Sequence, residues 1–160
     1  EALKADGRLV ATRVVSTAIV PPDAGEAAAL GAGAAEGVVR VVRLRLVDGD
    51  PYALETSTLV AKRFPGLEGY DFGSRSLYDT LGRDYGIRLV RARETVAPVL
   101  LTEEQAALLG VDLRQPALRL NRTTYDDANL ATEAASALVR GDRCQLLFEL
   151  WADQRAVRTG

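Results

Sequence analysis

The shortness of the turns between long extended segments constrains this fold more than any other feature of the sequence. The turns are Asp48-Gly49-Asp50-Pro51, Asp126 to Asn129 and Gly141-Asp142. Strands joined by so few residues can only pair antiparallel, because a parallel crossover needs a dozen residues or more. The strands are expected at about 12–20, 38–47, 52–60, 87–101, 117–125, 130–140 and 143–151.

Capping residues indicate about three helices between these strands. Asp23 and Glu26 have the spacing of a capping box, and Thr102 and Gln105 repeat it. The sequence therefore predicts an α+β domain, a central and mostly antiparallel sheet of six or seven strands covered by about three helices. The helices are expected to begin at Asp23, at Ser74 or Ser76, and at Thr102, and to end at Gly31 or Gly33, Gly86 and Gly110.

Composition removes several classes of chemistry. The chain has no histidine, which excludes Ser-His-Asp and Cys-His catalysis and histidine metal ligands. Its one cysteine, Cys144, excludes an internal disulfide and a cysteine zinc site, and it fits a reduced, cytoplasmic protein. No catalytic residue, metal or cofactor is predicted. The net charge of −2 argues against non-specific nucleic-acid binding, and no apolar run is long enough to span a membrane.

The 160 residues suit a single domain with its own core. Residues 1–11 are mostly polar and are expected to be the end of an interdomain linker, with the domain itself at 12–160. The chain contains no methionine, so we expect it to be a fragment of something longer or a processed product.

Three charged residues on two neighbouring strands form the sharpest candidate site. Arg43 and Arg45 point to the same side of one strand, because side chains alternate between faces. If the loop is Asp48 to Asp50, Val47 pairs with Pro51 and Arg43 lies opposite Glu55. Such a group suits an anion at the arginines and a hydroxyl or amine at the carboxylate. The alternative is a solvated strand face with a cross-strand ion pair.

Further candidates lie on a helix and on the last strands. Ser76 and Tyr78 stand at a predicted helix start, where free backbone N–H groups attract anions. Alternatively, Ser76 only caps the helix and Tyr78 only packs. Among the strand residues Arg122, Tyr125, Glu133 and Arg140, Glu133 has small alanine neighbours, so its carboxylate is either exposed on an edge or lines a cavity.

Together these positions resemble the effector-binding UTRA domain of GntR-family transcription regulators, in the HutC-type branch. The resemblance extends from about Val14 to Trp151 and lies in the order and spacing of short pieces. The pieces are Val42-Arg43-Leu44-Arg45, Asp48-Gly49-Asp50-Pro51, Glu55, Ser76-Leu77-Tyr78, Tyr85-Gly86-Ile87, Leu109-Gly110-Val111, Arg122-Thr123-Thr124-Tyr125-Asp126, Glu133 and Arg140-Gly141-Asp142-Arg143.

The resemblance implies a chorismate-lyase-like fold and an N-terminal winged helix-turn-helix, absent from this chain, that reads DNA. Members that respond to amino-sugar phosphates hold the phosphate with the two strand arginines and the Ser-x-Tyr, and meet the sugar with two carboxylates. This sequence departs at Val139, where many members have tyrosine, and at Cys144, where an aromatic residue is common. The expected ligand-binding residues are Arg43, Arg45, Glu55, Ser76, Tyr78, Arg122, Glu133 and Arg140.

These observations predict an effector-sensing domain without enzymatic activity. A small anionic metabolite, a sugar phosphate or a carboxylate, is expected to fill its cavity and to control DNA binding by the N-terminal domain of a homodimer. The carboxylates Glu55 and Glu133 are expected to meet the polar, uncharged end of that ligand. Two alternatives remain: a chorismate-lyase-like enzyme using Arg43, Arg45 and Glu55 on a carboxylated substrate, and a purely structural dimerisation module.

Overall fold

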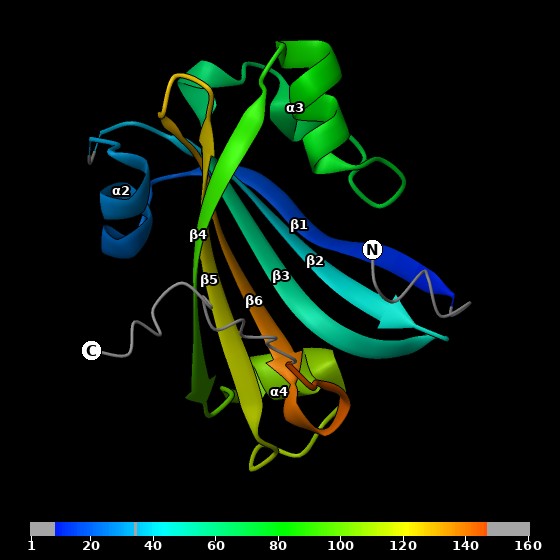
Figure 1. Cartoon of the computed structure of the whole chain (residues 1–160). Helices are drawn as coiled ribbons and strands as arrows, with labels where there is room; N and C mark the ends of the chain where they lie inside the picture. The colour runs from blue at the N-terminus through cyan, green and yellow to red at the C-terminus, as the bar shows by residue number, and fades with distance from the viewer. Residues whose placement is uncertain (1–8, 34, 147–160) are drawn as a thin grey trace, which may run out of the picture.

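The computed structural model describes residues 9–33 and 35–146 and contains one six-stranded sheet within them (Figure 1). The strands lie in the order β1-β2-β3-β6-β5-β4, and every neighbouring pair is antiparallel. The predicted α+β class with an antiparallel sheet is therefore confirmed. The strands are β1 (Val10–Val20), β2 (Val38–Val47), β3 (Asp50–Val60), β4 (Leu89–Val99), β5 (Ala117–Asp126) and β6 (Ala131–Arg140).

Within residues 9–33 and 35–146, three α-helices begin at the caps that the sequence indicates. They are α2 (Ala24–Leu30), α3 (Leu77–Tyr85) and α4 (Glu103–Leu109). Asp23 and Thr102 each form a complete capping box, whereas α3 is capped by Ser76 and not by Ser74. Each helix ends at a glycine in the left-handed conformation, and these are Gly31, Gly86 and Gly110.

The strand predicted at 143–151 is wrong where the structure describes it. Residues Gly141–Arg143 form a short 3-10 helix, and residues 144–146 have no regular structure. The local cause is a set of polar contacts: the Gly141 amide donates to the Pro116 carbonyl, and the Arg140 guanidinium holds Asp142. These contacts turn the chain away from a two-residue hairpin. Residues 147–151 of that prediction lie outside the described part of the chain.

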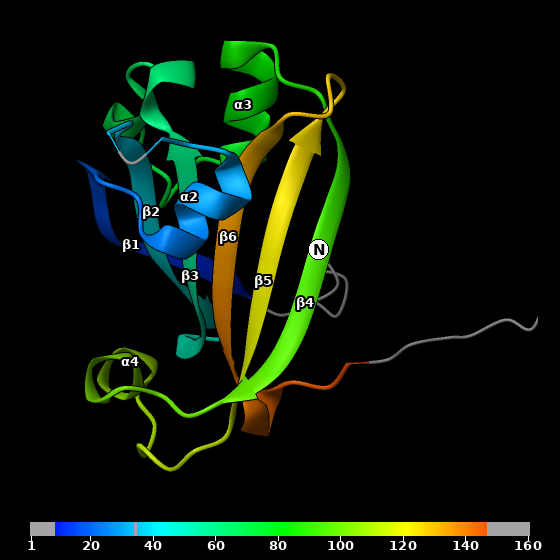
Figure 2. The ribbon, with the colours of Figure 1, turned by 90° about the vertical axis from the view of Figure 1, so that its left-hand side faces the viewer.

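The helices are divided between the two faces of the sheet. Alternate residues of β2 face opposite sides, so Val39 and Val41 pack against α3 while Val38 and Leu44 face α2 and α4. We call the first side the α3 face. Figure 2 shows α2 and α4 together on the other side of the strongly curved sheet. Because α3 contacts only one end of its face, no other helix among the described residues covers the rest of that face (Figure 1).

In the β2–β3 hairpin, Arg43 pairs with Glu55 as predicted, but the turn and the strand pairing next to it differ from the prediction. Its turn is only Asp48 and Gly49, both with positive φ (54° and 88°), which is the geometry that an Asp-Gly turn favours. Val47 consequently pairs with Asp50, so the predicted pairing of Val47 with Pro51 is wrong.

A β-bulge then corrects this offset of one residue. The register shifts between Arg45 and Leu46, where Tyr52 is the extra residue on β3. Beyond the bulge Arg43 pairs with Glu55, as the sequence predicts. The bulge therefore brings the charged residues of the two strands together on the α3 face.

Candidate ligand-binding site

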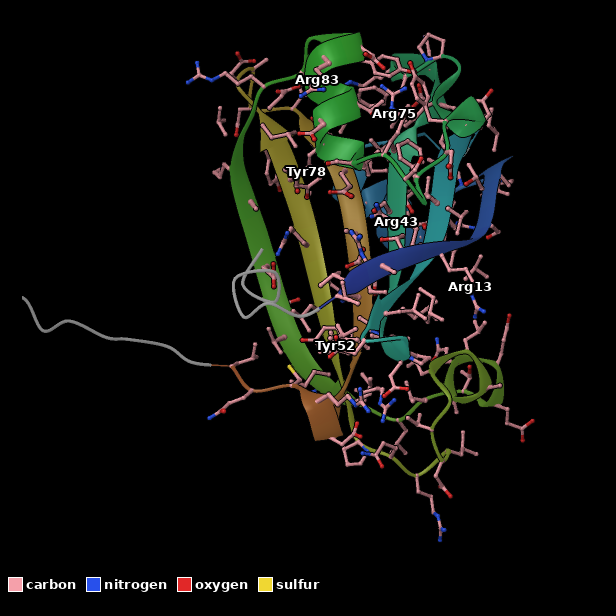
Figure 3. All side chains as sticks on the ribbon, turned by 90° about the vertical axis from the view of Figure 1, so that its right-hand side faces the viewer. Arg13, Arg43, Tyr52, Arg75, Tyr78 and Arg83 are labelled. Atoms are coloured by element: carbon pink, nitrogen blue, oxygen red, sulfur yellow. The ribbon has the colours of Figure 1, made fainter. Side chains whose placement is uncertain are left out.

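A cavity of about 1040 Å³ lies on the uncovered part of the α3 face. In Figure 3, which looks onto this face, Tyr78 stands below α3, Arg43 lies at mid-sheet and Tyr52 lies at the far end. The cavity brings together most of the predicted ligand-binding residues, but Arg140 is not among its lining residues. Those that line it are Arg43, Arg45, Glu55, Ser76, Tyr78, Arg122 and Glu133.

The charged residues begin where the apolar packing of α3 ends. On the α3 face of β2, the fully buried Val39 and Val41 are followed by Arg43 and then Arg45. The valines pack with Leu77 and other residues of α3 in one hydrophobic cluster. A strand that continued this pattern would present two more apolar side chains to the space beyond the helix. The arginines instead make that space polar.

Arg43 is buried without full hydrogen bonding. The residue is 6% exposed, and its Nη2 donates to Ser57 Oγ at 3.1 Å and lies 3.4 Å from Glu55 Oε2. Its Nε–H has no hydrogen-bond partner, which makes it the one such buried side-chain atom in the described part of the chain. Burial lowers the pKa of Arg43, although the charge of Glu55 opposes this effect. The buried guanidinium therefore retains an unused donor, and Arg43 is one of the residues that line the cavity.

Glu55 is shared between two arginines. Its Oε2 accepts a hydrogen bond from Arg45 Nε at 2.9 Å, and Arg45 Nη1 also donates to Thr12 Oγ1 on β1 at 2.6 Å. The structure thus contains the cross-strand ion pair of the alternative interpretation, and it also places that pair on a cavity wall. Two guanidinium groups against one carboxylate leave an excess of positive charge there.

The first turn of α3 contributes a hydroxyl to the opposite side of the cavity. Ser76 Oγ accepts a hydrogen bond from the Asp79 amide, so Ser76 is a helix cap and also a lining residue. Tyr78 does more than pack, because its hydroxyl donates to Glu133 Oε2 at 2.7 Å and lies 3.3 Å from Thr124 Oγ1. Burial and the charge of Glu133 both raise the pKa of Tyr78, so the phenol stays protonated and remains a donor.

Glu133 lines the cavity and is not exposed on an edge. Its residue exposure is 2%, and its carboxylate is bonded to the hydroxyls of Tyr78 and Thr124. Within the described residues, no ion pair includes Glu133. The cavity thus has a carboxylate held by neutral hydroxyls on one side and a surplus of arginine on the other.

The remaining polar strand residues separate into lining and structural groups. Arg122 lines the cavity and forms an ion pair with Glu94 on the neighbouring strand β4. Arg140 instead bonds Asp142 and the Pro51 carbonyl at the end of β6. Tyr125 is also outside the cavity, and the Arg91 guanidinium lies over its ring at 3.7 Å. Neither Arg140 nor Tyr125 is among the residues that line the cavity.

Several residues that line the cavity or support its walls are not predicted from the sequence. Thr12 and Ser57 line the cavity and hold the guanidinium groups, whereas Thr124 is not a lining residue and supports Glu133. Ser57 could have been predicted from the sequence, because it lies two residues after Glu55 and therefore on the same strand face. Tyr52 could not have been predicted in this way, because its position depends on the β-bulge. Of the two departures from the family pattern, Val139 lines the cavity, whereas Cys144 is not among the lining residues.

The described residues contain neither a metal-binding cluster nor a helix that could span a membrane. No three of their histidine, cysteine, aspartate or glutamate side chains are grouped closely enough to hold a metal ion. None of the helices in that part of the chain is both long and apolar enough to cross a membrane.

Comparison with protein families and curated proteins identifies similar sequences over nearly the whole chain. The model of the UTRA domain family matches residues 5–145. The HTH-type transcriptional repressor PhnF of Mycolicibacterium smegmatis is 34% identical over 157 residues, 98% of this chain and 64% of that protein. The HTH-type transcriptional repressor NagR of Bacillus subtilis is 32% identical over 143 residues, 89% of this chain and 58% of that protein. The chain thus spans less than two thirds of either relative.

Solved structures agree with these matches. The effector domain of PhnF from Mycobacterium smegmatis superposes with a TM-score of 0.87 and 34% identity, covering 94% of this chain and 93% of that one. The C-terminal domain of the histidine utilization repressor from Pseudomonas syringae has the same fold, with a TM-score of 0.81, 19% identity and coverage of 90% and 100%. These relatives are repressors and their effector domains, which favours regulation over the enzyme alternative.

Proposed function

This chain belongs to the UTRA domain family, the effector domains of GntR-family regulators, and we propose that it senses a small anionic metabolite. The ligand is a sugar phosphate or a carboxylate, and it fills the cavity on the α3 face. Its binding controls a winged helix-turn-helix domain that precedes this chain in the complete, cytoplasmic repressor. The length and the names of the curated relatives support that larger arrangement.

The observation that carries this proposal is the incomplete hydrogen bonding of Arg43. A buried donor without a partner costs roughly 1–3 kcal/mol, so such groups are rare unless something else uses them. An anion in the cavity would add a negative charge beside two arginines, and a movement of the buried Arg43 guanidinium would let the anion accept from the free Nε–H. Charge-assisted bonds of this kind are stronger than neutral ones. The α3 N-terminus at Ser76 adds favourable backbone dipoles on the same cavity.

The carboxylates in the cavity would orient the rest of the ligand. Glu133 is an acceptor, and a ligand donor facing it would join the hydroxyls of Tyr78 and Thr124. Glu55 is held by both arginines, so it is not placed as a free general base. That arrangement supports recognition and gives no support to the lyase alternative.

Regulation would require a dimer whose two halves respond to the ligand. We propose that this domain dimerises, through a strand edge or a sheet face, and thereby sets the separation of the two DNA-binding domains. A coupling of about 1–3 kcal/mol between effector and DNA would change operator affinity by 5- to 150-fold. DNA contact would come only from the preceding domain.

Native mass spectrometry of the chain purified from its own host tests the ligand assignment. We expect an added mass that dissociates as a small phosphate or carboxylate, and we expect Arg45→Ala to reduce its occupancy more than tenfold. Arg13→Ala is the matched control, because Arg13 is exposed on the neighbouring strand β1 (Figure 3). Equal occupancy in Arg45→Ala and wild type would contradict the proposal, and so would a ligand without an anionic group.

A further inference from the structure

Two rows of side chains cross the α3 face, and each changes from charged to apolar on the way. In the first row, Arg43 on β2 pairs with Glu55 on β3. The row then continues to Ala137 on β6 and Leu120 on β5. Side chains of directly paired residues lie on the same face of a sheet, and all four of these residues line the cavity.

The second row repeats this change one step further from α3. Arg45 on β2 pairs with Ala53 on β3, and Ala53 pairs with Val139 on β6. These three residues also line the cavity. Away from α3, the cavity therefore has a charged side at β2 and an apolar side at β6 and β5. We call the apolar side, which is formed by Ala137, Val139 and Leu120, the apolar floor.

Within the described residues, the apolar floor lies outside the hydrophobic clusters of the core. Ala137 and Leu120 are half-buried, so they still have apolar surface to cover. Toward α3, charged residues return on the same two strands, with Glu133 on β6 and Arg122 on β5. An apolar group placed on the floor would remove apolar surface from water, whereas a hydroxyl placed there would lose hydration and meet no polar side chain.

We propose that the effector is an amphiphilic anion, with an anionic group that faces Arg43 and Arg45 and a hydrocarbon body that lies over the apolar floor. This inference rests on the proposed function, because it uses the same cavity and the same anion site. It narrows the proposed ligand to a phosphate or carboxylate with an apolar body, and it excludes an anion whose body is a polyhydroxyl sugar.

The size of the cavity agrees with a ligand of this kind. Its volume of about 1040 Å³ is far larger than a phosphate or carboxylate group needs, and pockets of about 300–1,000 Å³ enclose drug-sized molecules. Leu120 on β5 is two strand spacings, about 10 Å, across the sheet from Glu55 on β3. An anion beside the arginines therefore needs a body of several carbons to reach Leu120.

Isothermal titration calorimetry with the whole chain and synthetic anions tests the apolar body. The probes are alkyl phosphates and alkyl carboxylates whose chains have two, four and six carbons. Each buried methylene should tighten binding about two- to fourfold, so we expect a gain of at least tenfold from the two-carbon to the six-carbon probe of the better-binding series. Hexan-1-ol, which has the chain but no anionic group, should not bind at millimolar concentration.

Polyhydroxyl anions of equal carbon number provide the comparison. Propyl phosphate is matched with glycerol 3-phosphate, and hexanoate is matched with gluconate. We expect the alkyl member of the better-binding pair to bind at least fivefold more tightly, because the floor covers its chain without a loss of hydrogen bonds to water.

Two leucine variants assign the gain from chain length to the apolar floor. Leu120→Asn keeps a similar shape but places a polar group on the floor. It should reduce the gain below threefold while leaving the affinity for the two-carbon probes within threefold of wild type. Leu118→Asn is the matched control and should keep the gain, because Leu118 is half-buried on the same face of β5 but does not line the cavity. Thermal melting verifies that both variants fold, and the wild-type probe series decides the question without them.

The outcomes distinguish this inference from the function beneath it. Equal binding of short, long and polyhydroxyl anions, abolished by Arg45→Ala, would overturn the apolar body and leave the anion sensor standing. The same result is expected if a second copy of the chain, and not the ligand, covers the floor. A gain that persists in Leu120→Asn would also overturn the assignment to the floor. If no anion of either series binds at millimolar concentration, both the anion site and the inference built on it fail.

Discussion

Replacement of Arg43 by methionine should separate ligand binding from stability. The guanidinium of Arg43 has one bond to Ser57, a 3.4 Å contact to Glu55 and an unpartnered Nε–H. The unmet donor costs about 1–3 kcal/mol, and the lost charged hydrogen bond is worth about 1.5–3 kcal/mol. Glu55 keeps its closer partner Arg45 after the change. We therefore expect Arg43→Met to alter the free energy of unfolding by no more than about 1 kcal/mol.

Arg40 provides a matched control on the same strand. It lies on the opposite face of β2 and makes two hydrogen bonds to Glu26, whose side chain is 13% exposed. Arg40→Met would leave the Glu26 carboxylate without its cation. Because Arg40 itself is 29% exposed, we expect a loss of about 1–3 kcal/mol, below the full cost of breaking a buried pair. Its effect on ligand binding should be negligible.

Urea unfolding and calorimetry with inorganic phosphate measure the two effects. Loss of one charge-assisted bond should weaken phosphate binding by Arg43→Met about 10- to 150-fold, whereas Arg40→Met should bind phosphate like wild type. If Arg43→Met unfolds as readily as Arg40→Met and still binds phosphate normally, Arg43 is a structural residue and the reasoning is wrong.

Two further predictions concern acid stability and assembly. Burial alone would raise the pKa of Glu26, but hydrogen bonds from Arg40 and Thr58 outweigh it and lower that pKa below 4.5. The stabilisation that ionised Glu26 provides is therefore complete above pH 4.5 and is lost as the pH falls through the pKa of the folded state. Urea unfolding should show that Glu26→Gln has a lower free energy of unfolding than wild type at neutral pH but not in acid. Sedimentation should show the isolated chain as a dimer, and gel shifts should show no specific binding to its operator. A strict monomer at high micromolar concentration, or a specific gel shift, would contradict this prediction.

Much of the fold followed from local rules. The Asp-Gly turn, the helix caps and the alternation of β2 were sufficient to predict the hairpin, the helix starts and the shared face of Arg43 and Arg45. The pairing of Arg43 with Glu55 was predicted through an incorrect loop length. The bulge at Tyr52 restored it, and bulges depend on how neighbouring strands pair in the sheet rather than on local sequence.

The contacts that define the cavity were harder to predict because they join distant segments. Tyr78 meets Glu133 only when α3 packs over the central strand β6, which no local pattern reports. Arg140 is predicted to bind ligand because it is a polar residue within a strand that otherwise carries apolar ones and because it belongs to the family pattern. Its nearest acidic neighbour along the chain, Asp142, instead holds it at the 3-10 turn. Local sequence therefore indicated the candidate charges but not their partners.

The position of the cavity follows from how far α3 extends over its face of the sheet. Where the helix covers β2, Val39 and Val41 are fully buried in an apolar cluster, and the next residues on the same face are arginines. Apolar residues there would leave a hydrophobic surface next to the helix, which would favour collapse of the cavity. The arginines resist that collapse because each needs a polar partner, and Glu55 supplies only part of what the two require. Arg43 and Arg45 thus lack part of the polar contact that they need, which keeps the space open. An anionic ligand would supply that contact.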